Sequence, residues 1–285
     1  MTLFLREPSA GKHGILSRQS TPGVLLYGHP GTGKTQLVRA FAKLPGATCL
    51  TLSRADIQSC MAGEAEKKIK QLFTYARRHH PCFITIDDAH FLFGNDSVNV
   101  TSRVDIISQF LAEMDGIRSQ GAADPIVIAA TSRPYDIDKS VLRRLGVRIM
   151  VDMPDTAARE QLLKIHLEGE TLADDVDVGE LAKTTKGYTG CDIKNLVWTA
   201  ANSAENEIRR RGQAVGSSSS SDNLRRVLSR SDFDRAKRTI PPSESSRVSK
   251  MMEFHMKFGR DLEADSECPE IDKLTDEGTE VYIFR

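Results

Sequence analysis

The sequence predicts an α/β protein: a five-stranded parallel sheet with helices on both faces, followed by a small helical domain. In the first half of the chain, five short apolar runs alternate with helical patterns; after Pro154 only helical patterns remain. Continuous apolar runs are typical of strands buried on both faces, and helices between them supply parallel crossovers. The 285 residues, 39% of them apolar, are enough for about two domains.

The predicted strands are short and bounded by turns or helical segments. In chain order they are Gly23–Tyr27, Ala47–Leu52, Cys82–Ile86, Pro125–Ala130 and Val147–Val151. Between them, helical segments are expected at Lys34–Leu44, at Glu64–His80 and around Ile107–Met114. In the second of these, Ile69, Leu72, Phe73 and Ala76 follow the i, i+3, i+4, i+7 spacing of one buried helix face, and Pro81 ends it.

Helical patterns continue at 156–168, 178–184, 191–211, 231–239 and 244–258. We therefore predict a large α/β domain over residues 1–153 and a helical domain over 154–259, with a flexible serine-rich insert at 212–222. An acidic tail follows at 260–285. Trp198 is expected in the core of the helical domain.

Composition narrows the classes of function. The 39 Lys and Arg balance the 39 Asp and Glu, so the chain lacks the basic excess of an electrostatic nucleic-acid or membrane-surface binder. No apolar run approaches the ~18 residues of a membrane span. The five cysteines are widely separated, which is typical of a reducing, intracellular compartment.

A glycine-rich loop indicates a polyphosphate site. The segment GHPGTGKT matches G-x-x-x-x-G-K-[ST] between a predicted strand and a helix. Glycines let backbone N–H groups and the helix N-terminus surround phosphates, Lys34 would neutralise the β- and γ-phosphates, and Thr35 would offer a hydroxyl to Mg²⁺. The expected ligands are therefore ATP and Mg²⁺, bound by Gly28, His29, Pro30, Gly31, Thr32, Gly33, Lys34 and Thr35.

A second motif, FITIDDAH, ends a buried strand in a carboxylate. Asp87 is predicted to hold Mg²⁺ through water, together with Thr35. His90, three residues later, is expected to be exposed to solvent.

The order of the motifs from Leu5 to Gly259 resembles the AAA+ ATPases of the classical AAA type. MAGEAEKKIKQLF is similar to the first pore loop, FITIDDAHFLFG to Walker B, IVIAATSRP to sensor 1, VLRRLGVRIMVDMPD to the arginine-finger segment and GYTGCDIKNL to the sensor 2 region. LRRLGVR and IPPSESS…FHMKFG resemble the branch of katanin, spastin and the mitochondrial outer-membrane protein extractases, with the fungal mitochondrial AAA ATPases most similar.

The resemblance implies roles for individual residues. Arg143 and Arg144 would be arginine fingers that reach the γ-phosphate of a neighbouring subunit, since guanidinium is planar and permanently charged. Gly190 and Asp192 would lie by the nucleotide in the lid, and Met61 would be the pore-loop residue. The resemblance also implies a homo-hexamer or mixed ring, a protein substrate and a mitochondrial location.

Four positions depart from the family pattern. Asp88 replaces the Glu that polarises the attacking water, and Ser132 replaces the Asn of sensor 1; a ~1 Å misplacement can cost on the order of 10²-fold in rate. These two changes either compensate or mark a weakened catalyst. Met61 replaces an aromatic residue, and His29 replaces a proline, with little consequence expected at the latter.

Three functions remain open at this point. The first is an ATP-driven protein remodelling or extraction motor, with Asp88, Ser132, Arg143 and Arg144 as its catalytic residues. The second is a nucleotide-binding scaffold or regulatory subunit with little turnover. The third, microtubule severing, fits the same fold but no basic region supports it. Only 27 residues precede Gly28, so we expect either that an N-terminal part is missing or that the chain relies on a partner.

Overall fold

The computed structural model describes residues 23–43, 45–58, 63–79, 81–94, 100–116, 125–214, 226–243 and 247–259. They form two compact units. The sheet unit takes its described residues from 23–28, 34–151 and 249–259, and the helical unit from 29–33 and 152–248.

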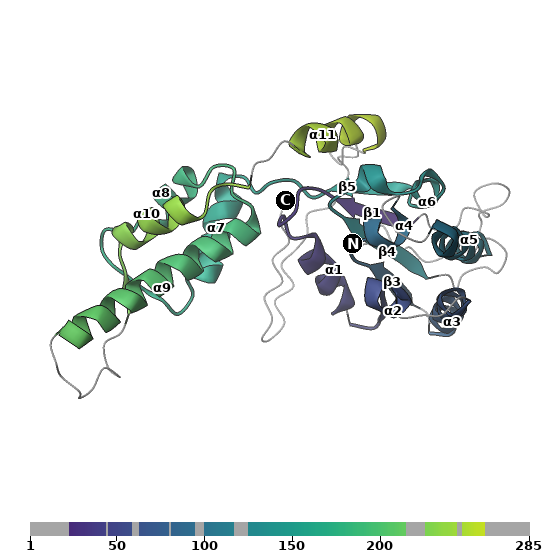
Figure 1. Cartoon of the computed structure of the whole chain (residues 1–285), viewed down its shortest axis with the longest axis horizontal. Coiled ribbons are helices and arrows are strands. Elements are labelled where there is room, and N and C mark those ends of the chain that lie inside the picture. Colours follow the sequence, from purple (N-terminus) through teal and green to yellow (C-terminus); the bar gives the residue numbers. More distant parts are fainter. Residues whose placement is uncertain are drawn as a thin grey trace. The chain divides into compact units, whose positions relative to one another are not determined.

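The sheet unit contains a five-stranded parallel sheet, which confirms the predicted fold class (Figure 1). Its strand order is β2-β3-β4-β1-β5. The strands are β1 (Val24–Tyr27), β2 (Thr48–Leu52), β3 (Cys82–Ile86), β4 (Ile126–Thr131) and β5 (Val147–Met150). β1 pairs with β4 and β5, so the residues that follow β1, β3 and β4 all leave the same edge of the sheet. Ligands of open α/β sheets bind at this carboxyl edge.

Both faces of the sheet are covered by helices. Leu25 and Tyr27 of β1 belong to a core cluster with Phe73, Phe110 and Phe254, whereas Val24 and Leu26 pack with Val38 on the other face. Successive side chains of β1 therefore point to opposite faces of the sheet and pack into two separate layers of the core. The helices of this unit are α1 (Lys34–Ala42), α2 (Arg54–Gln58), α3 (Glu64–Arg78), α4 (His90–Phe93), α5 (Val100–Gly116), η3 (Pro134–Asp136), α6 (Lys139–Arg144) and α11 (Arg247–Phe258).

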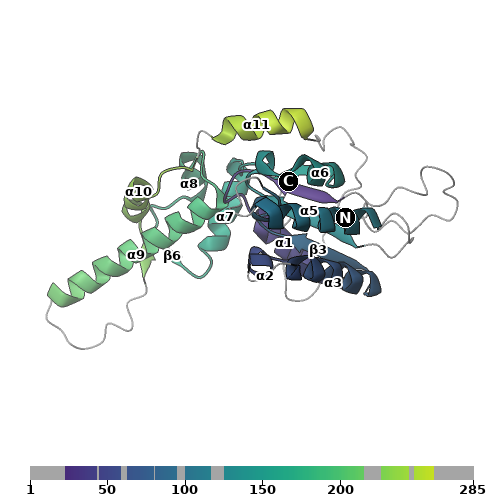
Figure 2. The same ribbon diagram turned by 45° about the vertical axis from the view of Figure 1, so that its right-hand side comes forward.

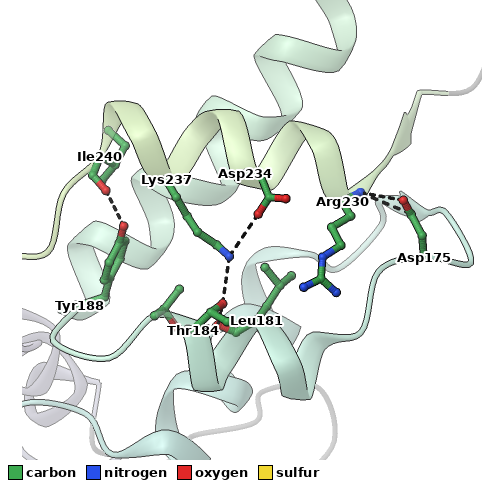
Figure 3. A network of polar contacts seen from close by, with 9 residues as sticks. Asp175, Leu181, Thr184, Tyr188, Arg230, Asp234, Lys237 and Ile240 are labelled. Atoms are coloured by element: carbon green, nitrogen blue, oxygen red, sulfur yellow. Dashed lines mark hydrogen bonds and ion pairs between the residues drawn. The ribbon is translucent and has the colours of Figure 1, made fainter.

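The helical unit has its own core, built by α7 (Thr156–His166), α8 (Val178–Thr184), α9 (Gly190–Ala214) and α10 (Arg230–Thr239). Polar contacts fix α10 beside α8 (Figure 3). The Lys237 ammonium donates to Thr184 Oγ1 at 2.9 Å, and the Tyr188 hydroxyl donates to the carbonyl of Ile240 at 2.5 Å.

Three expectations for the helical part are wrong. β6 (Thr171–Leu172) and β7 (Val227–Leu228) form a short parallel ladder, because tertiary packing can pair two residues that carry no strand pattern of their own. α9 extends to Ala214, so helix replaces the first residues of the predicted insert, whose positions 215–222 lie outside the described residues. Trp198 is 69% exposed rather than buried, because the core of the unit is filled from the opposite face of α9.

The sequence predicts α11 as part of the helical domain, but from Ser249 onward this helix belongs to the sheet unit. Met251 and Phe254 explain the difference, because both are buried in the sheet-unit core. The acidic tail 260–285 lies outside the described residues. No helix in the described part of the chain is long and apolar enough to span a membrane.

Candidate nucleotide-binding site

The phosphate loop leaves β1 at a position that only glycine can occupy. Gly28 has φ +154°, and a Cβ there would lie 2.1 Å from the carbonyl oxygen of Val151. The Val151 amide donates to the carbonyl of Tyr27 at 2.7 Å, which ties the end of β1 to the residue after β5. The first glycine of the motif is therefore required by close backbone approach.

The tip of the loop, residues 29–33, belongs to the helical unit. A Cβ on Gly31 (φ +84°) would lie 2.7 Å from Thr189 Oγ1, and the Gly31 carbonyl accepts from the Cys191 amide at 3.2 Å. Gly33 has φ +100°. The Thr32 hydroxyl donates to the carbonyl of His29 at 2.9 Å, so the loop is also bonded within itself.

Lys34 is the buried cation of the site. It is 8% exposed, and its ammonium donates to the Gly28 carbonyl at 3.0 Å. Burial lowers the pKa of Lys34 to about 8, against the opposing effect of the Asp88 and Asp87 carboxylates. A bound polyphosphate would stabilise the ammonium, so the loop suits the anion that the motif predicts.

Asp87 and Asp88 follow β3 at the carboxyl edge. The Asp88 amide donates to Asp87 Oδ1 at 3.0 Å. Asp88 is exposed and has φ +49°, a left-handed conformation that Asp adopts more readily than most residues. Both carboxylates act on the pKa of Lys34, which places these three predicted residues in one electrostatic site.

Half-buried Thr35 is the second residue of α1, directly after Lys34, so its hydroxyl belongs to the helix N-terminus. Hydroxyl and carboxylate oxygens are suitable Mg²⁺ ligands, and Thr35 and Asp87 supply one each. The donor types therefore fit the predicted ion, with the remaining ligands left to phosphate and water.

The expectation that His90 is exposed is wrong. His90 is 9% exposed, and its Nδ1 lies 3.0 Å from Thr131 Oγ1. Thr131 Oγ1 also accepts a hydrogen bond from the backbone amide of Arg133 at 3.0 Å. Half-buried Ser132 lies between these two residues in the chain. His90 thus connects the segment after β3 with the segment that holds Ser132, a link that sequence reasoning missed because it depends on the pairing of β3 with β4.

The two predicted arginine fingers have different surroundings. Arg144 donates from Nε and Nη2 to the Asp115 carboxylate at 3.0 and 2.7 Å, and this bidentate contact raises its pKa. Arg143 is exposed, and its side chain has no hydrogen bond or ion pair with any other described residue. Of the two, Arg144 is held within its own chain, whereas the role of Arg143 as an arginine finger stays a prediction.

In the helical unit, the Asp192 carboxylate holds the start of α9. It accepts from the amides of Thr189 and Ser243 at 2.9 and 3.2 Å, and from the Ser243 hydroxyl at 2.8 Å. The Asp192 amide in turn donates to Thr189 Oγ1 at 3.2 Å, which completes a capping box. Gly190 lies against the loop tip, since a Cβ there would be 3.3 Å from the Gly31 carbonyl. Nucleotide contacts by Gly190 and Asp192 stay a prediction, and Met61 lies outside the described residues.

Known proteins share this architecture. The family described as "ATPase family associated with various cellular activities (AAA)" matches residues 24–153. The AAA domain of FIGL-1 superposes with a TM-score of 0.71 at 30% identity, covering 84% of this chain and 78% of that one. The chain belongs to the AAA family. The FIGL-1 AAA domain in complex with ADP gives a TM-score of 0.70 at 29% identity, with the same shares of the two chains.

Other AAA relatives match over most of this chain. A probable spastin homologue of Caenorhabditis briggsae is 36% identical over 85% of this chain and 45% of its own length. A Cdc48 homologue of Archaeoglobus fulgidus is 36% identical over 83% of this chain and 33% of its own length. The katanin p60 ATPase-containing subunit A1 of Strongylocentrotus purpuratus is 39% identical over 70% of this chain and 39% of its own length. The chain thus spans between a third and a half of the length of these curated relatives.

Proposed function

We propose that this chain is the ATP-hydrolysing module of a ring-forming AAA machine that remodels or extracts proteins. The phosphate loop carries the proposal: Gly28 and Gly31 admit no side chain, and the loop leads into a buried lysine whose pKa is lowered to about 8. A buried ammonium beside glycine backbone is suited to a nucleotide polyphosphate. Membership of the AAA family, which is described as an ATPase family, supports the same function.

The residues of the sheet unit would divide the work. Lys34 would bind the β- and γ-phosphates, and Thr35 and Asp87 would hold Mg²⁺, which neutralises phosphate charge when bound. Asp88 and Ser132 would orient the attacking water. Arg143, exposed at the end of α6, would reach the nucleotide of a neighbouring copy, where such a finger is worth ~10³–10⁵ in rate in measured systems.

The geometry of Asp88 supports a second candidate, a nucleotide-binding subunit with little turnover. Its side chain is one methylene shorter than that of Glu, while its left-handed backbone suits Asp. Asp88→Glu would therefore lengthen the reach of the carboxylate but pay a small backbone penalty. These opposed effects make the exchange informative.

Steady-state ATP hydrolysis by the purified chain separates the two candidates. The variants are Asp88→Glu, Lys34→Ala and, as a matched control, Asp105→Glu on the exposed side of α5. Robust hydrolysis by the wild type that Lys34→Ala abolishes would support the motor. If the wild type binds ATP without turnover and Asp88→Glu restores it, the motor reading is wrong and the regulatory subunit stands. Asp105→Glu should match the wild type.

The ring and its substrate need separate tests. With ATP present, light scattering should show a hexamer, and Arg143→Ala should lower turnover without weakening ATP binding. A fluorescent unfoldable protein tests the remodelling activity, and Met61→Ala tests the pore loop. Because two relatives are named as spastin and katanin proteins, stabilised microtubules are the alternative substrate to assay. A mitochondrial location is part of the proposal, and imaging of a tagged full-length protein would test it.

A further inference from the structure

The last turn of α11 contacts the strand that enters the phosphate loop. His255 Nδ1 lies 2.6 Å from the hydroxyl of Tyr27, the residue directly before Gly28. The ring of Phe254 packs edge-on against Tyr27, with centroids 5.2 Å apart. Tyr27 is fully buried, and α11 holds its aromatic side chain by both polar and apolar contacts.

The same turn contacts Arg148 on β5. Arg148 Nη1 donates to the Phe258 carbonyl at 3.3 Å, and its guanidinium carbon lies 5.4 Å from the centre of the Phe258 ring. Burial lowers the pKa of Arg148, and the Tyr27 phenol opposes this shift. Arg148 and Tyr27 are therefore close enough to interact electrostatically at the β1–β5 edge.

Arg148 also holds the segment that carries the arginine fingers. Its Nη2 donates to the Leu142 carbonyl at 2.7 Å, and its Nε to the Leu145 carbonyl at 3.2 Å. Leu142 and Leu145 flank Arg143 and Arg144 in the chain. One guanidinium thus joins the backbone on both sides of the fingers to the end of α11, which lies next to α6 in both views (Figures 1 and 2).

The fit at the end of α11 is tight. A Cβ on Gly259 would lie 2.3 Å from His255 Nδ1 and 2.6 Å from the Tyr27 hydroxyl. The Gly259 amide donates to the His255 carbonyl at 2.7 Å, so this glycine ends the helix where it meets Tyr27. Substituting it would displace the contact.

We infer that Arg148, the last turn of α11 and Gly259 directly after it (residues 255–259) form a brace that positions both the phosphate-loop strand and the arginine-finger segment. His255 and Arg148 are its positioning residues; neither needs to touch the nucleotide. The catalytic consequence rests on the proposed function, whereas the mechanical link does not. His255 acts on the chain's own nucleotide site through Tyr27, and Arg148 acts on the fingers offered to a neighbour.

Hydrogen exchange of the nucleotide-free chain tests the link. His255→Ala should raise exchange at residues 24–28, and Arg148→Ala at residues 139–145. Met256→Ala is the matched control, because Met256 lies in the same turn but is 83% exposed. Protection of β3, which belongs to the same unit as the substituted residues, reports whether each variant is folded. If His255→Ala unfolds, Tyr27→Phe removes only the hydroxyl and is read in the same way.

Binding of a fluorescent ATP analogue and turnover then test the consequence. A typical hydrogen bond changes an equilibrium constant by about a factor of ten. We therefore expect His255→Ala to raise the dissociation constant of the nucleotide about tenfold, and His255→Asn to restore most of the lost affinity. Arg148→Ala should lower kcat about tenfold with binding changed less than twofold. If His255→Ala and Arg148→Ala both show the same hydrogen exchange as Met256→Ala, the proposed brace is wrong. If the variants show the expected hydrogen exchange but the wild type neither binds nor hydrolyses ATP, the proposed function is wrong and the brace still holds.

Discussion

Lys34→Met tests the energetic cost of the buried ammonium at the phosphate loop. Methionine has a similar length but no charge, so it removes the desolvation penalty together with the Lys34–Gly28 hydrogen bond. The lowering of the Lys34 pKa from 10.5 to about 8 corresponds to about 3 kcal/mol. Subtracting about 1 kcal/mol for the hydrogen bond, we expect the nucleotide-free variant to be about 2 kcal/mol more stable than the wild type at pH 7.

The pH dependence gives a sharper signature. Between the folded pKa of about 8 and the unfolded value of 10.5, the unfolded chain binds more protons at Lys34 than the folded chain does. The free energy of unfolding of the wild type therefore rises with pH through this window, by roughly 2.5 kcal/mol between pH 7 and pH 10. Lys34→Met lacks this contribution, so the stability difference between the two proteins should narrow over the same range.

Urea unfolding at pH 7, 8, 9 and 10 measures the difference. The control is Lys43→Met, an exposed lysine just past the end of α1, whose difference from the wild type should stay within about 0.5 kcal/mol at every pH. A Lys34→Met curve parallel to that of the wild type, or a variant less stable at pH 7, would refute the assignment of the pKa shift to burial.

Three further predictions follow from individual contacts. At pH 8.5, ATP binding should take up a fraction of a proton at Lys34, measured by calorimetry in buffers of different ionisation enthalpy; observed heats that do not change with the buffer would contradict this. Phe110→Ala should cost about 3–5 kcal/mol in urea unfolding, because Phe110 is fully buried against Phe73 and Phe93; a loss below 1 kcal/mol would show a collapsible site. Trp198, the single tryptophan, should emit at nearly the same wavelength in native and unfolded chains, and a blue-shifted native spectrum would indicate that it is covered.

The strands and the phosphate loop could be predicted from the sequence because their signals are local. Strands such as Cys82–Ile86 are continuous apolar runs since both of their faces are covered, and this leaves the pattern in the residues themselves. Gly28 and Lys34 are recognised by spacing, since the backbone conformation of the loop requires those residue types at those positions. The short helices α2, α4 and α6 could not be predicted, because a segment of four to six residues is too short to show a helical period.

By itself the sequence determined the parallel sheet, the helices that follow it and the chemistry of a polyphosphate site. Only the tertiary structure decided which neighbours cover each side chain. It buried His90 beside Thr131, exposed Trp198, tied Arg144 to Asp115 and placed α11 with the sheet unit. The physical reason is the same in each case: a residue's type sets what it can bond or bury, but the partner comes from a distant part of the chain. That partner is defined only when the strands and helices pack.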